Sequence, residues 1–266
     1  MMINCRPYRA ENPDELRQLA TLWSRVFGDP PALIDTFYRN LPYMGSCCVA
    51  EEDGRILGMA HLLHGFTLLE PGREPRICGY LYAVAVEEDA RGRGLGAELS
   101  RRAAAMGREQ GAEILCTLPA EEGLYRWYGD ILSLNCRCSR TVYTAPDLPK
   151  GCFRISTGEY GYYREDILFL TPHVELTNAA MDFQAQLCAA YGGGLYRSET
   201  ALFCAVQEGS TWLFPELLSF APVKDRSASP VFSPDALPEG FRPLVRPYLA
   251  SGLPFPDGFL WNLTFD

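Results

Sequence analysis

Two segments near the N-terminus carry apolar residues every three or four positions. The first opens at Asn12-Pro13 and closes at Gly28, and its apolar positions are Leu16, Leu19, Leu22, Trp23, Val26 and Phe27. The second starts near Pro31 and is expected to stop before Pro42, because proline has no amide hydrogen to donate. Its apolar positions are Leu33, Ile34, Phe37, Tyr38 and Leu41. This spacing predicts two amphipathic helices.

The pattern then becomes one of strands. Apolar runs at 47–51, 56–69 and 77–86 are separated first by Asp53-Gly54, a pair typical of a tight hairpin turn. A further helix is expected from Gly94, with Leu95, Leu99, Ala103 and Met106 on one face and Gly111 at its end, and residues 114–118 form a short strand. With a short strand at Ile3, the predicted order is strand, two helices, three antiparallel strands, helix, strand. That order predicts a mixed α/β (α+β) fold.

The second half is less regular. Residues 121–128 are expected to form a short helix and 132–143 a strand, after which the turn formers of 147–151 break the pattern. We therefore place a domain boundary there, with one domain at 1–147 and another at 152–266. Beyond it, 179–191 predicts a helix and 195–206 with 212–218 a hairpin. The proline-rich stretch 221–256 predicts an extended surface connection.

Composition agrees with two compact units. Hydrophobic residues make up 47% of the 266 positions, more than one core of about 100 to 150 residues requires. The net charge is −9, from 24 basic and 33 acidic residues, and no basic stripe with interleaved aromatic residues occurs. Nucleic acid is therefore not expected as a partner, because its binding depends on phosphate neutralisation. The acidic balance mildly favours a cationic small substrate.

Cysteine usage and hydropathy indicate the compartment. The ten cysteines are expected to be reduced and mostly buried, because a chain of this length needs no disulfide framework. No run of about 18 apolar residues occurs, and the opening residues MMINCRPYRAENPDE are polar where a signal peptide would be apolar. We expect a cytoplasmic protein with no membrane partner. The oligomeric state stays open, a homodimer included.

A glycine-rich loop follows the third predicted strand. It reads Arg91-Gly92-Arg93-Gly94-Leu95-Gly96 and leads into a predicted helix, a combination that directs backbone amides at a pyrophosphate. A loop that merely turns the chain is the plain alternative. Gly92-x-Gly94-x-x-Ala97 also matches the dinucleotide fingerprint, but five residues separate it from the strand and a hairpin precedes it. That setting argues against a nicotinamide cofactor.

The pattern Arg91-x-x-Gly94-x-Gly96, after Val84-Ala85-Val86, resembles the GNAT superfamily of acyl-CoA-dependent N-acyltransferases. The resemblance covers residues 1–147 and implies the GNAT fold, a central, mostly antiparallel sheet flanked by helices, with acetyl-CoA as co-substrate. It implies that the strand end binds the pantetheine arm and that loop amides surround the pyrophosphate, with Arg93 nearer the nucleotide phosphate. The implied binding residues are Val84, Ala85, Val86, Arg91, Gly92, Arg93, Gly94, Leu95, Gly96 and Ala97.

A second motif lies downstream. Leu124-Tyr125-x-x-x-Gly129 resembles the family pattern in which the tyrosine is the general acid, which implies that Tyr125 returns a proton to the CoA thiolate. A tyrosine suits this role because its hydroxyl is protonated at neutral pH. The alternative is that Tyr125 only packs on its helix. Residues 119–123 lack the asparagine that many relatives carry there, which leaves cofactor contacts on that side open.

The base that would deprotonate the amine is not evident. Candidates are Tyr80, Tyr82, Glu87, His64 and the terminal Asp266, and a water chain is an alternative. His61 and His64 are three residues apart, which on a strand sends them to opposite faces, and His173 is the only other histidine. We therefore expect no metal site.

The second half resembles the degenerate unit of tandem GNAT proteins, mainly in the predicted hairpin that ends at Leu218. Such a unit would narrow the range of amines that enter. The resemblance as a whole implies acetyl transfer from acetyl-CoA to a primary amine of a small molecule or peptide, by direct attack. The alternative is a non-catalytic acyl-CoA sensor or interaction protein.

Overall fold

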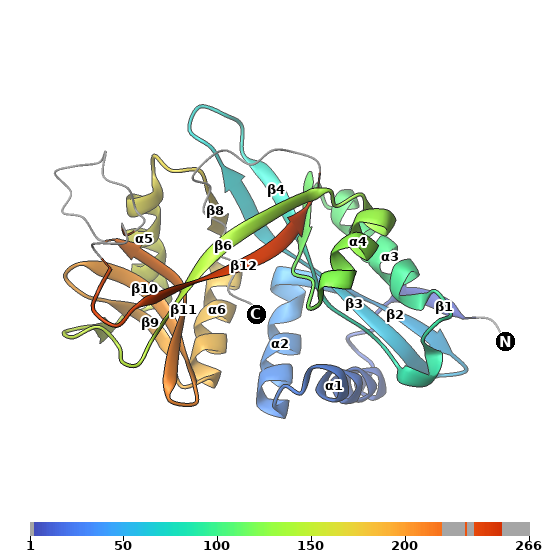
Figure 1. Cartoon of the computed structure of the whole chain (residues 1–266). Coiled ribbons are helices and arrows are strands. Elements are labelled where there is room, and N and C mark those ends of the chain that lie inside the picture. The colour runs from blue at the N-terminus through green and yellow to red at the C-terminus, as the bar shows by residue number, and fades with distance from the viewer. Residues whose placement is uncertain (1–2, 220–231, 233–236, 252–266) are drawn as a thin grey trace. The chain divides into compact units, whose positions relative to one another are not determined.

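The computed structural model describes residues 3–219, 232 and 237–251 (Figure 1). These residues divide into two compact units. Within the described residues, unit 1 comprises 3–66, 76–138 and 248–251, and unit 2 comprises 67–75, 139–219, 232 and 237–247. The chain therefore leaves unit 1 after residue 138 and contributes to it again from Tyr248.

Unit 1 is built on a mostly antiparallel sheet. Its order is β1-β2-β3-β4-β5, followed by the end of β12. The strands are β1 (Asn4–Pro7), β2 (Gly45–Glu52), β3 (Arg55–Leu69), β4 (Arg76–Val86), β5 (Ile114–Thr117) and β12 (Arg242–Ala250). β4 and β5 run parallel, whereas β12 is antiparallel to β5, with Leu249 opposite Thr117. The mixed α/β fold expected from the sequence is confirmed.

Of the two N-terminal helices, the first begins and ends at recognisable sequence signals, and the second does not end where the sequence predicts. In α1 (Pro13–Phe27) the Asn12 side chain accepts a hydrogen bond from the Asp14 amide, and Gly28 closes the helix at φ 76°. α2 (Pro31–Met44) continues through Pro42, so the predicted stop before that residue is wrong. Proline removes one bond from the last turn, but Leu41 and Met44 on either side are buried and keep that turn packed.

Side chains alternate between the two faces of this sheet. Cys48, Ala60 and Leu62 pack in a core cluster with residues of α3 (Leu95–Glu109) and α4 (Glu122–Leu132). His61, between two of them in sequence, contacts Trp23 of α1 and Phe37 of α2 instead. Because successive strand residues point to opposite faces, α1 and α2 cover one face and α3 and α4 the other (Figure 1).

Unit 2 has its own helices and strands. α5 (Thr157–Leu168) and α6 (Asn178–Ala190) accompany a sheet in the order β6-β11-β10-β9-β7. These strands are β6 (Cys136–Ala145), β11 (Thr211–Ser219), β10 (Ala201–Glu208), β9 (Gly194–Arg197) and β7 (Phe153–Arg154), and β8 (His173–Leu176) lies off this path. The predicted helix is confirmed as α6, and the predicted hairpin is confirmed in the antiparallel pair β10–β11. The single strand expected at 195–206 is wrong, because it is divided into β9 and β10, which pair with each other.

Two features of the second half differ from the sequence prediction. The α5 helix was not predicted, although Ser156 and Glu159 form a reciprocal capping box at its start. The expected connection at 221–256 contains strand β12, so that interpretation is wrong for Arg242–Ala250. Pro243 and Pro247 obscure this strand in the sequence, because proline disfavours strand interiors.

Candidate active site

The parallel strands β4 and β5 separate toward their carboxyl ends. Their register runs from Cys78 opposite Ile114 to Tyr80 opposite Cys116. One residue further, the Thr117 hydroxyl donates to the Leu81 carbonyl oxygen at 2.9 Å. β5 ends at Thr117, whereas β4 continues to Val86. The last residues of β4 therefore have no β5 residue beside them. A slot of this kind exposes backbone groups that an extended ligand can pair with.

A local distortion lies within that free part of β4. Ala83 has φ 46°, in the left-handed region that L-residues rarely adopt. Its carbonyl oxygen lies 3.4 Å from His61 Nδ1 on β3. Regular pairing to β3 resumes beyond it, because the Glu87 amide donates to the Leu57 carbonyl at 2.8 Å. The strand is therefore kinked where the slot opens.

Two glycines of the loop lie in the left-handed region of backbone conformation. Gly92 and Gly94 have φ 76° and 78°, and a Cβ atom on either would meet nothing within 4 Å. Glycine is therefore favoured by backbone conformation rather than by crowding. Gly94 is the N-cap of α3 and no side chain caps it. The first amides of a helix have no intrahelical acceptor, so those at the start of α3 are available to a ligand anion.

The two arginines of the loop have different partners. Arg91 Nε donates to the Val86 carbonyl oxygen at 3.3 Å, which ties the loop to the end of β4. Arg93 forms an ion pair with Glu52 at 2.7 Å and lowers the pKa of that carboxyl group. Arg93 is thus directed toward β2 in this structure.

Strand, loop and α4 meet at Gly96. A Cβ atom built there would lie 3.6 Å from the Trp127 ring and 3.7 Å from Val86 Cγ2, both ordinary contact distances. Three of the segments implied by the resemblance are therefore neighbours: the end of β4, the start of α3, and α4 with its Tyr125 motif.

Tyr125 is half-buried on α4. The Arg137 guanidinium carbon lies 4.3 Å from its ring centroid, and Arg137 is itself held by two hydrogen bonds to Glu122, at 2.7 and 2.9 Å. Sequence reasoning missed Glu122 and Arg137, and no motif marks them. Glu122 begins α4 and Arg137 lies on β6, so their ion pair forms only once the fold brings this helix and this strand together.

The neighbouring Tyr128 is a different kind of tyrosine. Its side chain is buried, and burial raises its pKa to about 12, although a hydrogen bond with Thr117 acts in the opposite direction. It belongs to the core beneath α4.

The predicted base candidates lie in unlike surroundings. Tyr80 is buried, and its ring centroid lies 5.6 Å from that of Tyr82. Glu87 is ion-paired with Arg25, and burial lowers the pKa of His64. Asp266 lies outside the described residues. None of these contacts assigns the base, so all five stay predictions.

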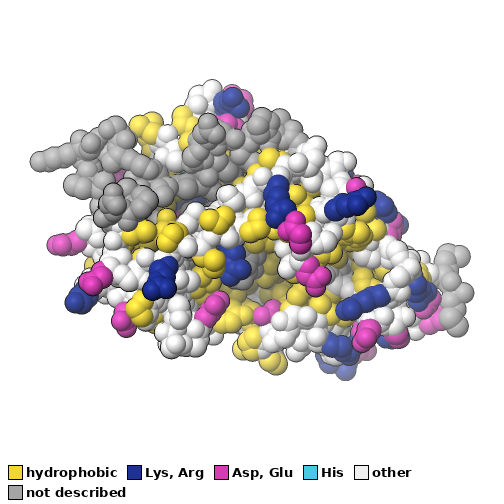
Figure 2. Space-filling view, viewed as in Figure 1, with side chains coloured by type: hydrophobic (Ala, Val, Ile, Leu, Met, Phe, Trp, Pro, Cys, Tyr) yellow, Lys and Arg dark blue, Asp and Glu magenta, His cyan; other side chains and the backbone are white. Residues whose placement is uncertain are grey.

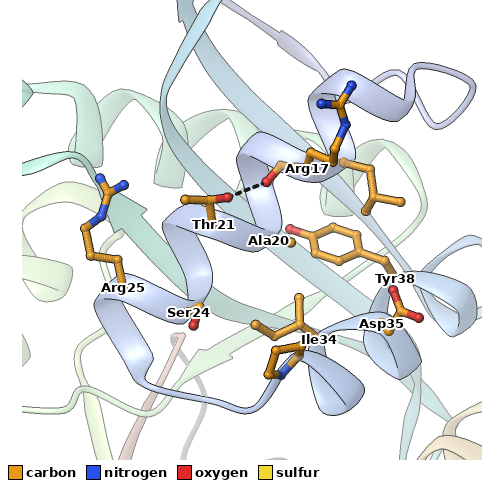
Figure 3. Close-up of a pocket in the computed structure, with 10 residues that line it drawn as sticks. Arg17, Ala20, Thr21, Ser24, Arg25, Ile34, Asp35 and Tyr38 are labelled. Carbon is orange, nitrogen blue, oxygen red and sulfur yellow. Dashed lines mark hydrogen bonds between the residues drawn. The ribbon is translucent and has the colours of Figure 1, made fainter.

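A pocket of about 580 Å³ opens between α1 and α2 (Figure 3). Its lining residues are Leu16, Arg17, Ala20, Thr21, Ser24, Arg25, Pro31, Ile34, Asp35 and Tyr38. The Tyr38 ring points across the space toward Ala20 and Thr21 of α1 (Figure 3). The Tyr38 hydroxyl lies 3.1 Å from His61 Nε2, so one hydrogen-bonded chain runs from the pocket wall to the kink in β4.

Three further observations concern surface charge, metal ligands and the hydropathy of the helices. Basic and acidic side chains are interspersed on the face shown in Figure 2. Within the described part of the chain, no group of three or more His, Cys, Asp or Glu side chains could hold a metal ion, and none of its helices is long and apolar enough to span a membrane.

Residues 7–129 match the family model described as an acetyltransferase (GNAT) domain. The match runs from β1 into α4 and contains the strand end, the glycine loop and Tyr125. This match covers slightly less than half of the chain, so residues 7–129 are similar to a GNAT acetyltransferase domain, and the sheet with its flanking helices has the GNAT fold.

Solved structures share this fold over nearly the whole chain. A GCN5-related N-acetyltransferase from Kribbella flavida has 14% identity and a TM-score of 0.66, covering 94% of this chain and 70% of its own. A conserved protein of unknown function from Enterococcus faecalis has 12% identity, a TM-score of 0.63 and coverages of 94% and 72%. Eis1 from Mycobacterium abscessus has 15% identity, a TM-score of 0.57 and coverages of 92% and 73%. No curated protein matches the chain in sequence.

Proposed function

We propose that this chain transfers an acetyl group from acetyl-CoA to a primary amine by direct attack. The observation that carries the proposal is the geometry of β4. The strand leaves β5 after Leu81, kinks at Ala83, and leads into the uncapped, glycine-rich start of α3. An extended thioester with a pyrophosphate suits a slot that ends in free amides. The family match over residues 7–129 supports the same conclusion.

The binding roles follow from this geometry. Val84, Ala85 and Val86 would pair with the pantetheine arm along the slot, and amides of Gly92, Arg93, Gly94, Leu95, Gly96 and Ala97 would surround the pyrophosphate. Arg91 would hold the loop against the end of β4 through its bond to the Val86 carbonyl. The Arg93 side chain would serve the nucleotide phosphate only after leaving Glu52.

The proposed reaction is a single acyl transfer. The neutral amine nitrogen forms a bond to the thioester carbon, the carbon–sulfur bond breaks, and the amine's proton passes to a base or water. Tyr125 donates its phenolic proton to the departing thiolate. Stacking under Arg137 restrains the Tyr125 ring, so that its hydroxyl keeps one direction.

We propose further that the chain consists of a catalytic domain at 1–147 and a degenerate GNAT-like domain at 152–266. These bounds follow the chain, and they differ from the compact units because 67–75 and 139–147 belong to unit 2 and the end of β12 pairs with β5 in unit 1. The support for the second part is its antiparallel pair β10–β11 with helices α5 and α6. The glycine run Gly192-Gly193-Gly194 follows α6 instead of preceding a helix, so it is not a second pyrophosphate loop.

Calorimetric titration with acetyl-CoA tests the proposal. We expect micromolar binding by the wild type and none by Gly94→Glu, because a carboxylate in the loop repels the pyrophosphate. Gly72→Glu is the matched control: Gly72 has φ 77° and open surroundings like Gly94, but lies outside the loop. Absence of binding by the wild type would refute the function. Binding without acetylated product across a broad amine panel would favour the non-catalytic sensor.

A further inference from the structure

His61 lies at the centre of an aromatic cluster on the α1–α2 face of the sheet. Its side chain is fully buried and contacts the rings of Trp23, Phe37 and Tyr38. A histidine in such surroundings needs a hydrogen-bond partner for each ring nitrogen. It has them: Nδ1 lies 3.4 Å from the Ala83 carbonyl oxygen, and Nε2 lies 3.1 Å from the Tyr38 hydroxyl. The backbone of the adjacent Tyr82 is a further hydrogen-bond partner of the ring.

These partners determine where the protons are. Burial lowers the pKa of His61 to about 4, so the ring is neutral near pH 7. A carbonyl oxygen only accepts, so Nδ1 must carry the single ring hydrogen and Nε2 must accept. Burial also raises the pKa of Tyr38 well above its usual value, which keeps its hydroxyl a donor. The chain therefore runs in one direction, from the Tyr38 hydroxyl through His61 to the Ala83 carbonyl.

The Ala83 carbonyl and the Val84 amide belong to one peptide group. That group is planar and trans, so its C=O and N–H bonds point in opposite directions. A hydrogen bond that fixes the carbonyl also fixes the direction of the N–H. Donation to the carbonyl polarises the peptide and strengthens the N–H as a donor.

The Val84 N–H points away from β3. The Glu87 amide donates to Leu57 of β3, and the Ala85 carbonyl lies against Gly58 of the same strand. Successive strand residues direct their backbone groups to alternate sides, so residues 84 and 86 face the β5 side. The Val86 carbonyl accepts from Arg91 of the loop, as expected for that side. On this side β5 has already ended, and the slot is open.

We propose that His61, oriented by Tyr38, is a positioning residue for acyl transfer. It holds the kinked Ala83–Val84 peptide so that the Val84 N–H is directed at the thioester carbonyl oxygen of the bound acyl donor. As that oxygen gains negative charge in the transition state, the preset amide stabilises it. This inference rests on the proposed function. It also explains how Ala83 keeps a left-handed backbone conformation that is unfavourable for an L-residue.

Two polar, uncharged substitutions of His61 distinguish a role in holding the Ala83–Val84 peptide from a role in packing the aromatic cluster. His61→Asn places an amide donor near the position of Nδ1 and keeps the bond to Ala83. His61→Gln places its amide near the position of Nε2 and loses that bond. Phe37→Leu disturbs the same aromatic cluster without removing either hydrogen bond, and thermal unfolding of all three variants reports on stability. Tyr38→Phe keeps the ring and removes the hydroxyl, which lies 3.1 Å from His61 Nε2 and 3.6 Å from Met59 Sδ.

The primary readout needs no known acceptor. Acetyl-CoA labelled with carbon-13 at the thioester carbonyl is bound to each protein, and its carbonyl stretch is measured by infrared difference spectroscopy. We expect a shift to lower frequency in the wild type, His61→Asn and Phe37→Leu. We expect the shift to be lost in His61→Gln and reduced in Tyr38→Phe. With an amine that is turned over, kcat of His61→Gln should fall about ten- to a hundredfold while KM for acetyl-CoA changes little.

The outcomes separate the two proposals. A wild type that does not bind acetyl-CoA refutes the function and this inference with it. A wild type that binds, with the same carbonyl shift in His61→Gln or in a folded Tyr38→Phe, leaves the function standing and overturns the role of His61. Loss of the shift in Phe37→Leu as well would assign the effect to packing and equally overturn it.

Discussion

Arg137 lies with its guanidinium carbon 4.3 Å from the ring centroid of Tyr125, and Glu122 holds it there through both carboxylate oxygens. The three residues come from the start of α4, its second turn and the following strand β6. A planar cation over an aromatic face is attracted to it and so restrains the ring. The proposed general acid is thus held by neighbours that no catalytic motif contains.

Tyr125→Phe should lower kcat by about a hundredfold and leave acetyl-CoA affinity unchanged, because it removes a proton donor but no binding contact. Steady-state kinetics with calorimetry in parallel measures both quantities. Tyr128→Phe is the control: it removes a buried hydroxyl bonded to Thr117, so we expect lower stability but unchanged kcat. Equal kcat in Tyr125→Phe and wild type would leave Tyr125 a packing residue.

Arg137→Gln should lower kcat several-fold, less than Tyr125→Phe, because the acid stays but its ring is less restrained. Arg126→Gln is the comparison. Arg126 lies beside Tyr125 on α4, but it is exposed, and its ion-pair partner Asp130 is 3.8 Å away. We expect Arg126→Gln to match the wild type. If both variants behave alike, the stacking on Tyr125 has no role in turnover.

Gly94→Ala should lower the free energy of unfolding by about 1–2 kcal/mol, because φ 78° strains any L-residue. Gly96→Ala should be neutral or stabilising by up to about 1 kcal/mol, because Gly96 is within α3 and its Cβ would make only ordinary contacts with Trp127 and Val86. Chemical denaturation of the two variants measures the difference. A larger loss for Gly96→Ala would show that the start of α3 is packed more tightly than described.

Glu15 should make stability depend on acidic pH. Burial alone would raise its pKa, but hydrogen bonds from Arg6 and Arg9 lower it to about 2, from an ordinary value of 4.5. The folded pKa is therefore depressed, so the stabilisation is fully present above about pH 4.5 and is lost as pH falls toward 2. The shift corresponds to about 3 kcal/mol near neutral pH.

The test is Glu15→Gln, compared with wild type by denaturant unfolding at pH 7 and near pH 3. We expect the variant to be less stable by about 2–4 kcal/mol at pH 7, because Arg6 loses one of its two carboxylate partners, at 2.6 Å, and Arg9 loses its ion pair with the same group. The difference should shrink as the wild-type carboxyl group becomes protonated. A difference that stays constant with pH would mean that the loss comes from packing rather than charge.

Local signals in the sequence located most of the elements from β1 to β5. Apolar periodicity located α1, α2 and α3, and glycines marked both the end of α1 and the loop before α3, because these features depend on residues within one or two helical turns. The same signals failed at Pro42 and Arg242–Ala250, where burial and strand pairing outweighed the local preference of proline.

The sequence by itself determined the order of elements from β1 to β5, the place of the glycine loop before α3, and the segment that holds the candidate acid. Only the tertiary structure decided which groups support them. Arg137 meets Tyr125 across a helix–strand connection, His61 meets Ala83 from a neighbouring strand, and Leu249 pairs with Thr117 across more than half the chain. Contacts between residues so distant in sequence leave no periodic trace, because the chain between them can take many paths and only the packed fold selects one.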